Sequence, residues 1–367
     1  MSARESLLAF SLEPRLLPSR WASRASPLLA MVVTATIAGA MFALLGASPL
    51  TGIQALLLSP INSASGISEV LLKASPLCLT AIGLSIAFKT SVNNIGAEGQ
   101  VILGGIGATA VALHVPDSMS AWLAISLALL AGAAAGGLWA ALPAWLRTRF
   151  GVNETLTTLL LVYVAVQLLS WLTTGPWRDP QGLNFPETRL FNANMTLPKL
   201  SDMGWSIWDG TRLNISAFFA VAAAVITQIF MTRSPMGFRL VVSGLAPRAA
   251  AYAGFSASTS IWAALSISGA LSGFAGAVEV CGTLGQLQAG WVPGYGFTAI
   301  VAAYLGRLSA GLIVLSALLL ALIDIGSTNV QMALGLPSAV SALLQGVLLL
   351  SILGLDLLVR YRIRRIA

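Results

Sequence analysis

Polar and ionisable side chains that stand inside or beside long apolar stretches are the main candidates for chemistry in this sequence. Asn94, Glu98 and Gln100 open one such stretch, within the heptapeptide NIGAEGQ at 94–100. Asn94 and Glu98 are four residues apart, so they share one face if the segment is helical. An ionisable group in an apolar stretch needs a partner, a cavity or a function. The cluster therefore predicts either contact with a polar solute or a structural role at a helix start, where side chains cap backbone N–H groups.

Other polar groups near apolar runs offer the same choice of roles. Asn153 and Glu154 directly precede an apolar run, where the amide could cap a helix and the carboxylate could face the positive end of the helix dipole. Glu279 and Asp324 stand in two later apolar runs. Either of these acids could line a vestibule or be hydrated at a membrane surface.

Apolar runs of membrane-spanning length fill most of the chain. Only 9% of its residues are charged and 57% are hydrophobic, with a mean hydropathy of +0.85, and about 20 apolar residues suffice for a helix to cross a bilayer. We predict an all-α, polytopic integral membrane protein with about ten transmembrane helices, some of them short or broken. The predicted spans are 28–46, 67–88, 95–114, 120–144, 155–173, 213–232, 259–280, 295–306, 309–328 and 336–358.

Two pairs of glycines have the spacing that permits close packing between helices. Gly132 precedes Gly136 by four residues, and Gly269 precedes Gly273 by four. Small residues at this spacing let two helix backbones approach one another. We therefore predict tight helix packing at both motifs, without a more specific role.

The distribution of basic residues predicts the orientation in the membrane. With the N-terminus inside, 15 of the 20 Lys and Arg residues fall in cytoplasmic segments, as the positive-inside rule requires. Both termini are then cytoplasmic, as a tail at 1–27 and a basic tail at 359–367, and they flank a single transmembrane domain at 28–358. The polar loop 174–212 then lies outside, and the connection 233–258 lies inside.

The two long connections have features that suit contact with other proteins. The outer loop carries three tryptophans, which fit either an interfacial aromatic belt or a docking surface for an extracytoplasmic partner. In the inner connection, Ala246–Gly254 predicts a short helix with Pro247 in its first turn and a glycine stop. Its alanines leave a shallow surface that another protein's groove could accept. The residues of this predicted docking element are Gly244, Pro247, Ala249, Ala250, Tyr252 and Gly254.

Motifs for the commonest enzyme chemistries do not occur in the sequence. It has no GxxxxGK[ST] phosphate-binding loop, no HExxH, no GxSxG and no cluster of Cys and His residues. The net charge of +7 does not indicate nucleic-acid binding, because the basic residues stand at helix ends and in tails, where lipid headgroups account for them. We expect no cofactor, no metal and no enzymatic activity. Transport with energy supplied from elsewhere is the function class that remains.

Six short motifs occur in a fixed order along the chain. They are NIGAEGQ at 94–100, GVNE at 151–154, LLVY at 160–163, GPWRDP at 175–180, SGALSGFAGA at 268–277 and GYGF at 294–297. Together they resemble permease subunits of ABC importers of the ribose and branched-chain amino acid superfamily, and most of all the longer permease subunit of its nucleoside-type branch. The resemblance covers about residues 65–355. It departs from the family at Val162, Ala246 and Lys89, where Asn, Asn and Arg are usual.

This resemblance implies the transmembrane subunit of an ATP-binding cassette importer for nucleosides or simple sugars, in the bacterial inner (plasma) membrane. It implies three protein partners: a separate ATPase that binds the docking element, a second permease subunit, and an extracytoplasmic substrate-binding protein. The residues predicted to border the substrate pathway are Asn94, Glu98, Gln100, Asn153, Glu154, Tyr163 and Asp324. The alternative is an ion-coupled secondary transporter that uses intramembrane carboxylates, and a stand-alone channel is the third reading.

Overall fold

The computed structural model describes residues 10–14, 20–335 and 361–365, together with residues 339, 343, 346–347, 350–351 and 354–355. The chain divides into two compact units. Unit 1 combines Met1–Asn62 with Leu322–Ala367, and unit 2 is Ser63–Ala321.

Unit 1 contains the ends of the chain. Its elements are β1 (Phe10–Pro14), α1 (Arg20–Leu44), α2 (Pro49–Leu57), the 3-10 turn η2 (Ser59–Ile61), the second half of α12 (Ala310–Leu334) and β2 (Tyr361–Arg365). Strands β1 and β2 pair antiparallel, with Phe10 opposite Arg365 and Pro14 opposite Tyr361. This two-stranded ribbon joins the two predicted tails and is an addition to the all-α prediction. The predicted span 336–358 lies largely outside the described residues.

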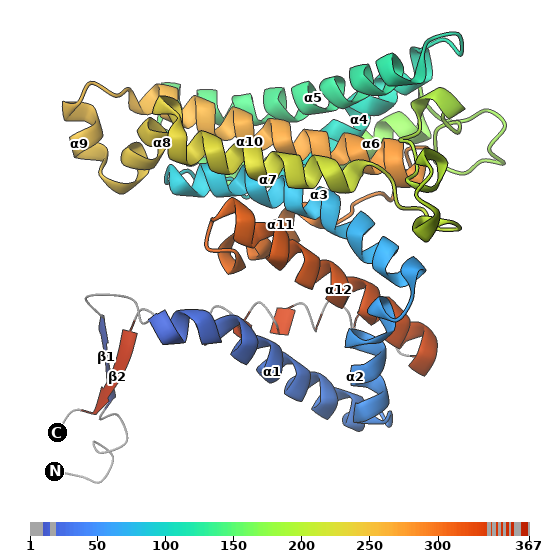
Figure 1. Cartoon of the computed structure of the whole chain (residues 1–367). Helices are drawn as coiled ribbons and strands as arrows, with labels where there is room; N and C mark the ends of the chain where they lie inside the picture. The colour runs from blue at the N-terminus through green and yellow to red at the C-terminus, as the bar shows by residue number, and fades with distance from the viewer. Residues whose placement is uncertain are drawn as a thin grey trace. The chain divides into compact units, whose positions relative to one another are not determined.

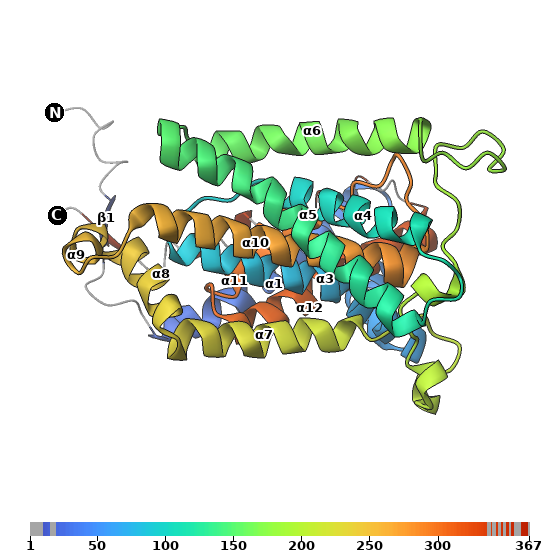
Figure 2. The same ribbon diagram turned by 90° about the horizontal axis from the view of Figure 1, so that it is seen from above.

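Unit 2 is a helical bundle that holds most of the predicted spans. Its long helices are α3 (Ala64–Lys89), α4 (Ala97–His114), α5 (Ala121–Phe150), α6 (Glu154–Thr174), α7 (Ser216–Arg233) and α10 (Ala257–Glu279). Its shorter elements are α8 (Pro235–Leu245), α9 (Pro247–Tyr252), the π-helix η6 (Val280–Leu284), α11 (Tyr295–Leu305), and the 3-10 turns η3 (Ala193–Met195), η4 (Ser201–Met203) and η5 (Ser206–Trp208). Helices α6 and α7 lie at opposite edges of the bundle, with α5 and α10 between them (Figure 2).

Six described helices are long and apolar enough to cross a membrane: α3, α5, α6, α7, α10 with η6, and α12. α3 is the central one, since 89% of its most apolar window is buried. α5 has 30 residues, which at 1.5 Å per residue gives about 45 Å, longer than the hydrocarbon core of a bilayer. The prediction of a polytopic, mainly helical membrane protein is therefore confirmed. The count of ten spans and the side on which the termini lie remain predictions.

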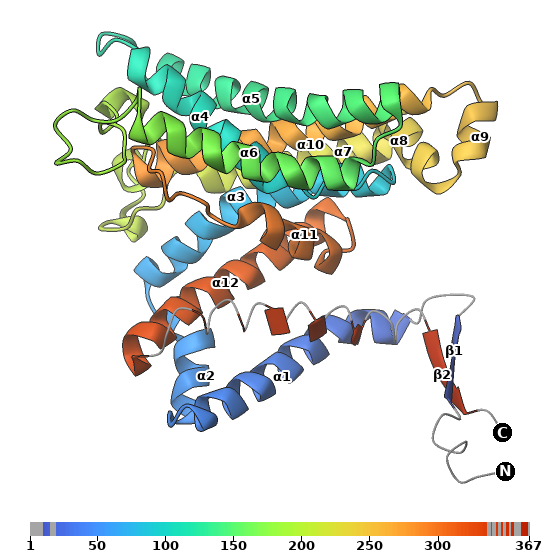
Figure 3. The same cartoon turned by 180° about the vertical axis from the view of Figure 1, so that it is seen from behind.

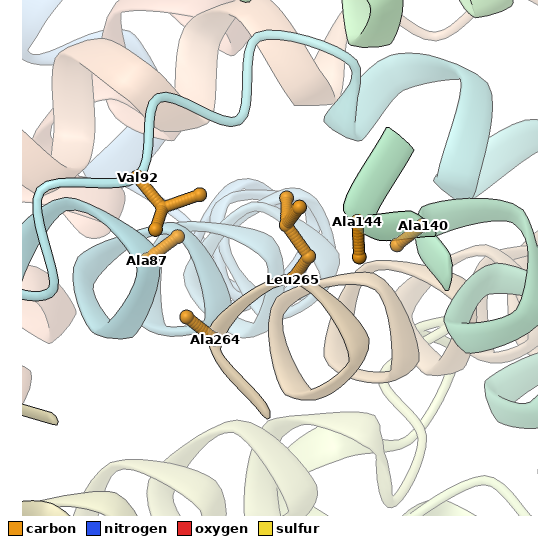
Figure 4. Packing of buried hydrophobic residues seen from close by; sticks show 6 residues of the cluster. All are labelled: Ala87, Val92, Ala140, Ala144, Ala264 and Leu265. Carbon is orange, nitrogen blue, oxygen red and sulfur yellow. The ribbon is translucent and has the colours of Figure 1, made fainter. Parts of the chain in front are cut away.

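The two glycine motifs pack against each other across α5 and α10. A Cβ added to Gly136 would overlap the carbonyl oxygen of Gly269, and a Cβ on Gly273 would overlap that of Gly132. Any larger residue would force the two backbones apart, so the predicted close packing is confirmed. A small hydrophobic cluster continues this interface toward the end of α3, as Figure 4 shows. Its members are Ala87, Val92, Ala140, Ala144, Ala264 and Leu265.

The two ends of unit 2 are built differently. Helices α8 and α9 stand at one end, and the long loop between α6 and α7, residues 175–215, covers the other (Figure 1). The extended segment 285–294 leads from the loop end back along the bundle to α11 (Figure 3). The predicted short helix at Ala246–Gly254 is confirmed as α9, which is followed by Gly254 in the left-handed region at φ +80°. Helix α8, directly before it, was not predicted.

Candidate functional site

The connection between α3 and α4, residues 90–96, contacts three other helices within a few residues. The Ser91 hydroxyl donates to the carbonyl of Gly244 at the end of α8 (3.0 Å). The backbone N–H of Ile95 donates to the hydroxyl of Thr158 on α6 (3.2 Å), and the Asn94 side chain reaches α10. This connection is the structural centre of the candidate site, because the NIGAEGQ motif begins within it.

Asn94 and Gln100 form a closed amide pair. The Asn94 Nδ2 donates to Gln100 Oε1 (2.9 Å), and Gln100 Nε2 donates back to Asn94 Oδ1 (3.1 Å). Asn94 Nδ2 also donates to the Ser268 hydroxyl on α10 (3.0 Å), and its Oδ1 accepts the N–H of Gly96 (3.2 Å). Both amides are buried, and both the nitrogen and the oxygen of the Asn94 side chain have partners inside the chain. In this conformation the pair fixes the connection to α10.

Glu98 holds the start of α11. Its carboxylate is fully buried at 0% exposure. One oxygen accepts the backbone N–H of Gly294 (2.7 Å) and the other accepts that of Gly296 (2.6 Å). A carboxylate at a helix N-terminus satisfies N–H groups that have no partner within the helix, and it opposes the helix dipole. A Cβ on Gly296 would overlap the backbone nitrogen of Glu98, so only glycine permits this approach.

Asn153 and Glu154 stabilise the start of α6. The Asn153 carbonyl oxygen accepts the N–H groups of Thr155 (2.9 Å) and Leu156 (3.4 Å), which is an N-cap. The Glu154 carboxylate accepts a charge-assisted hydrogen bond from Arg147 at the end of α5 (2.6 Å). The same oxygen accepts the N–H of Asn93 in the connection (3.3 Å). Glu154 therefore joins the α5–α6 turn to the connection between α3 and α4.

Tyr163 does not lie with this cluster, and Asp324 belongs to the other unit of the chain. Tyr163 is 66% exposed on the outer face of α6, away from the buried amides. Asp324 is half-buried on the part of α12 that belongs to unit 1. The structure thus brings together Asn94, Glu98, Gln100 and Glu154, with Asn153 beside them, whereas Tyr163 faces outward from α6.

The α8–α9 end joins the connection through glycine packing. A Cβ on Gly244 would overlap the carbonyl oxygen of Lys89, the last residue of α3. Gly244 is therefore a packing residue that seats α8 on the end of α3, in addition to accepting the Ser91 hydroxyl. These contacts place α8 directly against the residues that precede Asn94.

Within α9 the exposed face differs from the predicted one. Ala250 is only 3% exposed, and its carbonyl accepts the N–H of Phe255 (2.9 Å). Because Ala250 packs inside the chain, it does not reach a partner. Tyr252 is 97% exposed. The exposed predicted docking residues are Pro247, Ala249, Tyr252 and Gly254.

Several contributors to the site were not predicted from the sequence. Thr158, Ser268 and the backbone of Gly294 and Gly296 each complete a hydrogen bond of the motif residues. Ser268 and Gly296 do lie in motifs that were noted, SGALSGFAGA and GYGF. Their pairing was not visible, because the contacts join residues between 63 and 198 positions apart.

The fold and this site define a polytopic membrane permease. The family model for the permease component of the branched-chain amino acid transport system matches residues 66–353, so the chain belongs to that family. A glucose ABC transporter permease of Haloferax volcanii is 35% identical over 355 residues, covering 96% of this chain and 93% of the relative. A guanosine ABC transporter permease of Bacillus subtilis is 32% identical over 326 residues, covering 88% and 91%. A nucleoside ABC transporter permease of Lactococcus lactis is 30% identical over 306 residues, covering 82% and 83%.

The chain is accordingly a permease subunit of an ABC importer and a multi-pass membrane protein. The alternative of an ion-coupled secondary transporter is not supported. Two of the carboxylates that it requires are already occupied, since Glu98 binds two backbone N–H groups and Glu154 binds Arg147. A proton carrier must instead release and regain its proton during each cycle.

Proposed function

We propose that this chain forms the translocation pathway of an importer for nucleosides or, as the second candidate, simple sugars. The names of its relatives support both classes, because they include guanosine and nucleoside permeases and a glucose permease. Substrate is delivered by an extracytoplasmic binding protein, energy comes from a separate ATPase subunit, and a second permease chain completes the pathway. The transporter resides in the bacterial inner membrane, with loop 174–212 outside and both termini in the cytoplasm.

The observation that carries this proposal is the continuous contact from α9 to α11. α9 presents an exposed face, α8 is seated on the end of α3 at Gly244, and the connection that follows is bonded to α10 through Asn94. Glu98, four residues further on, holds α11. An ATPase that moves α9 would therefore move the helices that line a pathway. Asn94, Gln100 and Glu98 act as positioning residues in this proposal, and Tyr163 and Asp324 remain candidates for contact with substrate.

Uptake into proteoliposomes tests the substrate class. The transporter complex, purified through a tag on this chain, is reconstituted with its binding protein and ATP, and uptake of labelled guanosine and labelled glucose is compared. We expect ATP-dependent guanosine uptake that unlabelled nucleosides inhibit. Glucose uptake without guanosine uptake would move the assignment to the sugar class, and uptake that follows a proton gradient without ATP would reject the importer.

Substitution on α9 tests the docking role. Tyr252→Glu places a charge on the exposed face and should abolish co-purification of the ATPase while the permease keeps its melting temperature, because the charge is desolvated only in the complex. Leu183→Glu is the matched control, since Leu183 is an 88% exposed apolar residue at the loop end. Undiminished ATPase binding by Tyr252→Glu would refute docking at α9. Ala250→Glu is not a suitable test, because it buries a charge within the chain.

Cysteine labelling tests the orientation. The native Cys78 and Cys281 are buried, so they give little background. Ser206→Cys in the outer loop and Ala253→Cys beside α9 are both at exposed positions. We expect a membrane-impermeant maleimide to label the first from outside in intact cells and the second only after permeabilisation. The reverse pattern would invert the proposed topology.

A further inference from the structure

A row of charged side chains runs from the long loop into the helices of unit 2. Arg212, at the end of loop 175–215, forms a bidentate salt bridge with Glu69 of α3. The distances are 3.0 Å from Nε to Oε1 and 2.7 Å from Nη2 to Oε2. The hydrogen bond to this carboxylate raises the pKa of the Arg212 guanidinium, so the cation stays charged. Lys73 follows Glu69 by four residues on the same helix, one turn deeper.

The row continues to the start of α11. The Lys73 ammonium lies 5.0 Å from the centre of the Tyr295 ring. The Tyr295 hydroxyl donates to the buried carboxyl group of Glu279 (3.1 Å). We call the set Arg212, Glu69, Lys73, Glu279 and Tyr295 the charge chain.

The members of the charge chain differ in how readily they can separate. Arg212 and Glu69 meet at a partly exposed position, whereas Glu279 is buried. The Tyr295 side chain contacts α10 through its hydroxyl and α3 through its ring. These contacts join α11 to the frame of loop, α3 and α10, and they can open and close without moving a charged side chain of the charge chain itself.

We propose that the charge chain couples the position of loop 175–215 to that of α11, with Lys73, Glu279 and Tyr295 as positioning residues in the transport cycle. This inference rests on the proposed function, in which the loop receives the binding protein. A partner that shifts Arg212 alters the charges around Glu69 and Lys73, and thereby the hold of Glu279 on Tyr295. The effect of the outer partner then reaches α11. Glu98 binds the start of this same helix and so connects it to the α9 end.

Tyr295→Phe is the first test, because it removes the hydroxyl and keeps the ring beside Lys73. We expect the melting temperature and the basal ATPase rate of the purified complex to stay at the parental values. Stimulation of the ATPase by the guanosine-loaded binding protein should fall about fivefold or more, the range of typical coupling between sites. Parental stimulation, or a loss that only follows a lower melting temperature, would overturn the proposal.

Charge inversion is the second test, because it separates a chain from an isolated salt bridge. Exchanging only Glu69 and Arg212, as Glu69→Arg with Arg212→Glu, restores that pair but sets two cations one turn apart on α3. We expect no rescue relative to Arg212→Glu alone. Adding Lys73→Glu and Glu279→Arg restores the alternation and should recover stimulation. Full rescue by the two-residue exchange would show an isolated pair and overturn the coupling.

Hydrogen–deuterium exchange provides a readout that does not depend on transport. In Arg212→Ala, we expect faster exchange at the α11 amides of residues 297–300. The control is Arg189→Ala, which breaks another anchor of the same loop, the bond from Arg189 to the Leu113 carbonyl (2.6 Å), and should leave α11 unchanged. Equal exchange at α11 in both variants would overturn the proposal even if the protein transports. Failure of the parental protein to transport, together with faster exchange at α11 in Arg212→Ala but not in Arg189→Ala, would support the coupling and refute the proposed function.

Discussion

The two ends of unit 2 are fastened by different kinds of contact. At the loop end, Arg212 and Glu69 meet as ions at a partly exposed position. At the α9 end, Gly244 packs against the backbone of Lys89 without space for a methyl group, and a neutral hydroxyl of Ser91 completes the contact. Ion pairs near water are weakened by salt and by competing charges, whereas close packing transmits displacement as a rigid contact does. The loop end can thus respond to a charged partner, and the α9 end can transmit a displacement of α8.

Glu98 lies between the two ends and belongs to neither type. It is a buried carboxyl group whose two oxygens each accept a backbone N–H group. Neither salt nor a partner's side chain can compete for it there. Four expected outcomes, from the largest effect to the smallest, test this distinction.

Glu98→Ala should have the largest effect. It leaves the N–H groups of Gly294 and Gly296 buried without acceptors, at a cost of about 1–3 kcal/mol for each. We expect loss of uptake and a large fall in the melting temperature in detergent. Glu98→Gln retains one acceptor oxygen and should fall between the alanine variant and the parent. Unchanged stability in Glu98→Ala would mean that α11 is not held by this residue.

Gly244→Ala should have the next largest effect. The added methyl group overlaps Lys89, and overpacking of this kind costs about 1–3 kcal/mol. We expect uptake to fall further than stability, because α8 loses its seat on α3. Gly137→Ala is the matched control: its Cβ would make only ordinary contacts at 3.5 Å, and alanine in a helix interior is favoured by about 0.5–1 kcal/mol. If both variants melted alike, the contact at Gly244 would not be a tight one.

Ser268→Ala should have a moderate effect on stability. Asn94 loses one acceptor and keeps Gln100, so we expect a loss of about 1 kcal/mol, measured by thermal unfolding. Ser272→Ala serves as the control, since the Ser272 hydroxyl only donates to a carbonyl of its own helix (2.9 Å). If Ser268→Ala and Ser272→Ala melted at the same temperature, the hydrogen bond between Asn94 and Ser268 would not stabilise the contact with α10.

Arg212→Ala should have the smallest effect on stability. The Arg212 side chain is 61% exposed, and pairs of this kind contribute roughly 0–1 kcal/mol after screening. We expect the melting temperatures of parent and variant to converge as salt rises, whereas the difference between parent and Gly244→Ala should not depend on salt. Salt dependence at both positions would remove the contrast between the two ends.

Local patterns in the sequence predicted most of the fold. Hydropathy located the long helices, the paired glycine motifs indicated close packing, and Asn153 and Pro247 marked helix starts that the structure contains. These features depend on residues within a few positions of each other. The sequence did not predict α8 or the burial of Ala250, because the direction in which a short helix faces depends on packing against α8 and Phe255.

The candidate site was only half predictable for the same physical reason. The residues of NIGAEGQ stood out, because polar groups in apolar stretches are costly. Their roles depended on partners that hydropathy does not identify, such as the glycine backbone that binds Glu98 and the serine that binds Asn94. The charge chain was missed as well, since Arg212 and Glu69 lie 143 positions apart.

The distance along the chain between Glu98 and its partners sets an order for biosynthesis. Gly294 follows Glu98 by 196 residues, and a ribosome that adds about 5–20 residues per second takes roughly 10–40 s to reach it. Throughout that interval the Glu98 carboxylate lacks the two donors that satisfy it in the folded protein. The contact between α4 and α11 therefore forms late, so an early helix of the permease gains one of its partners among the last steps of assembly.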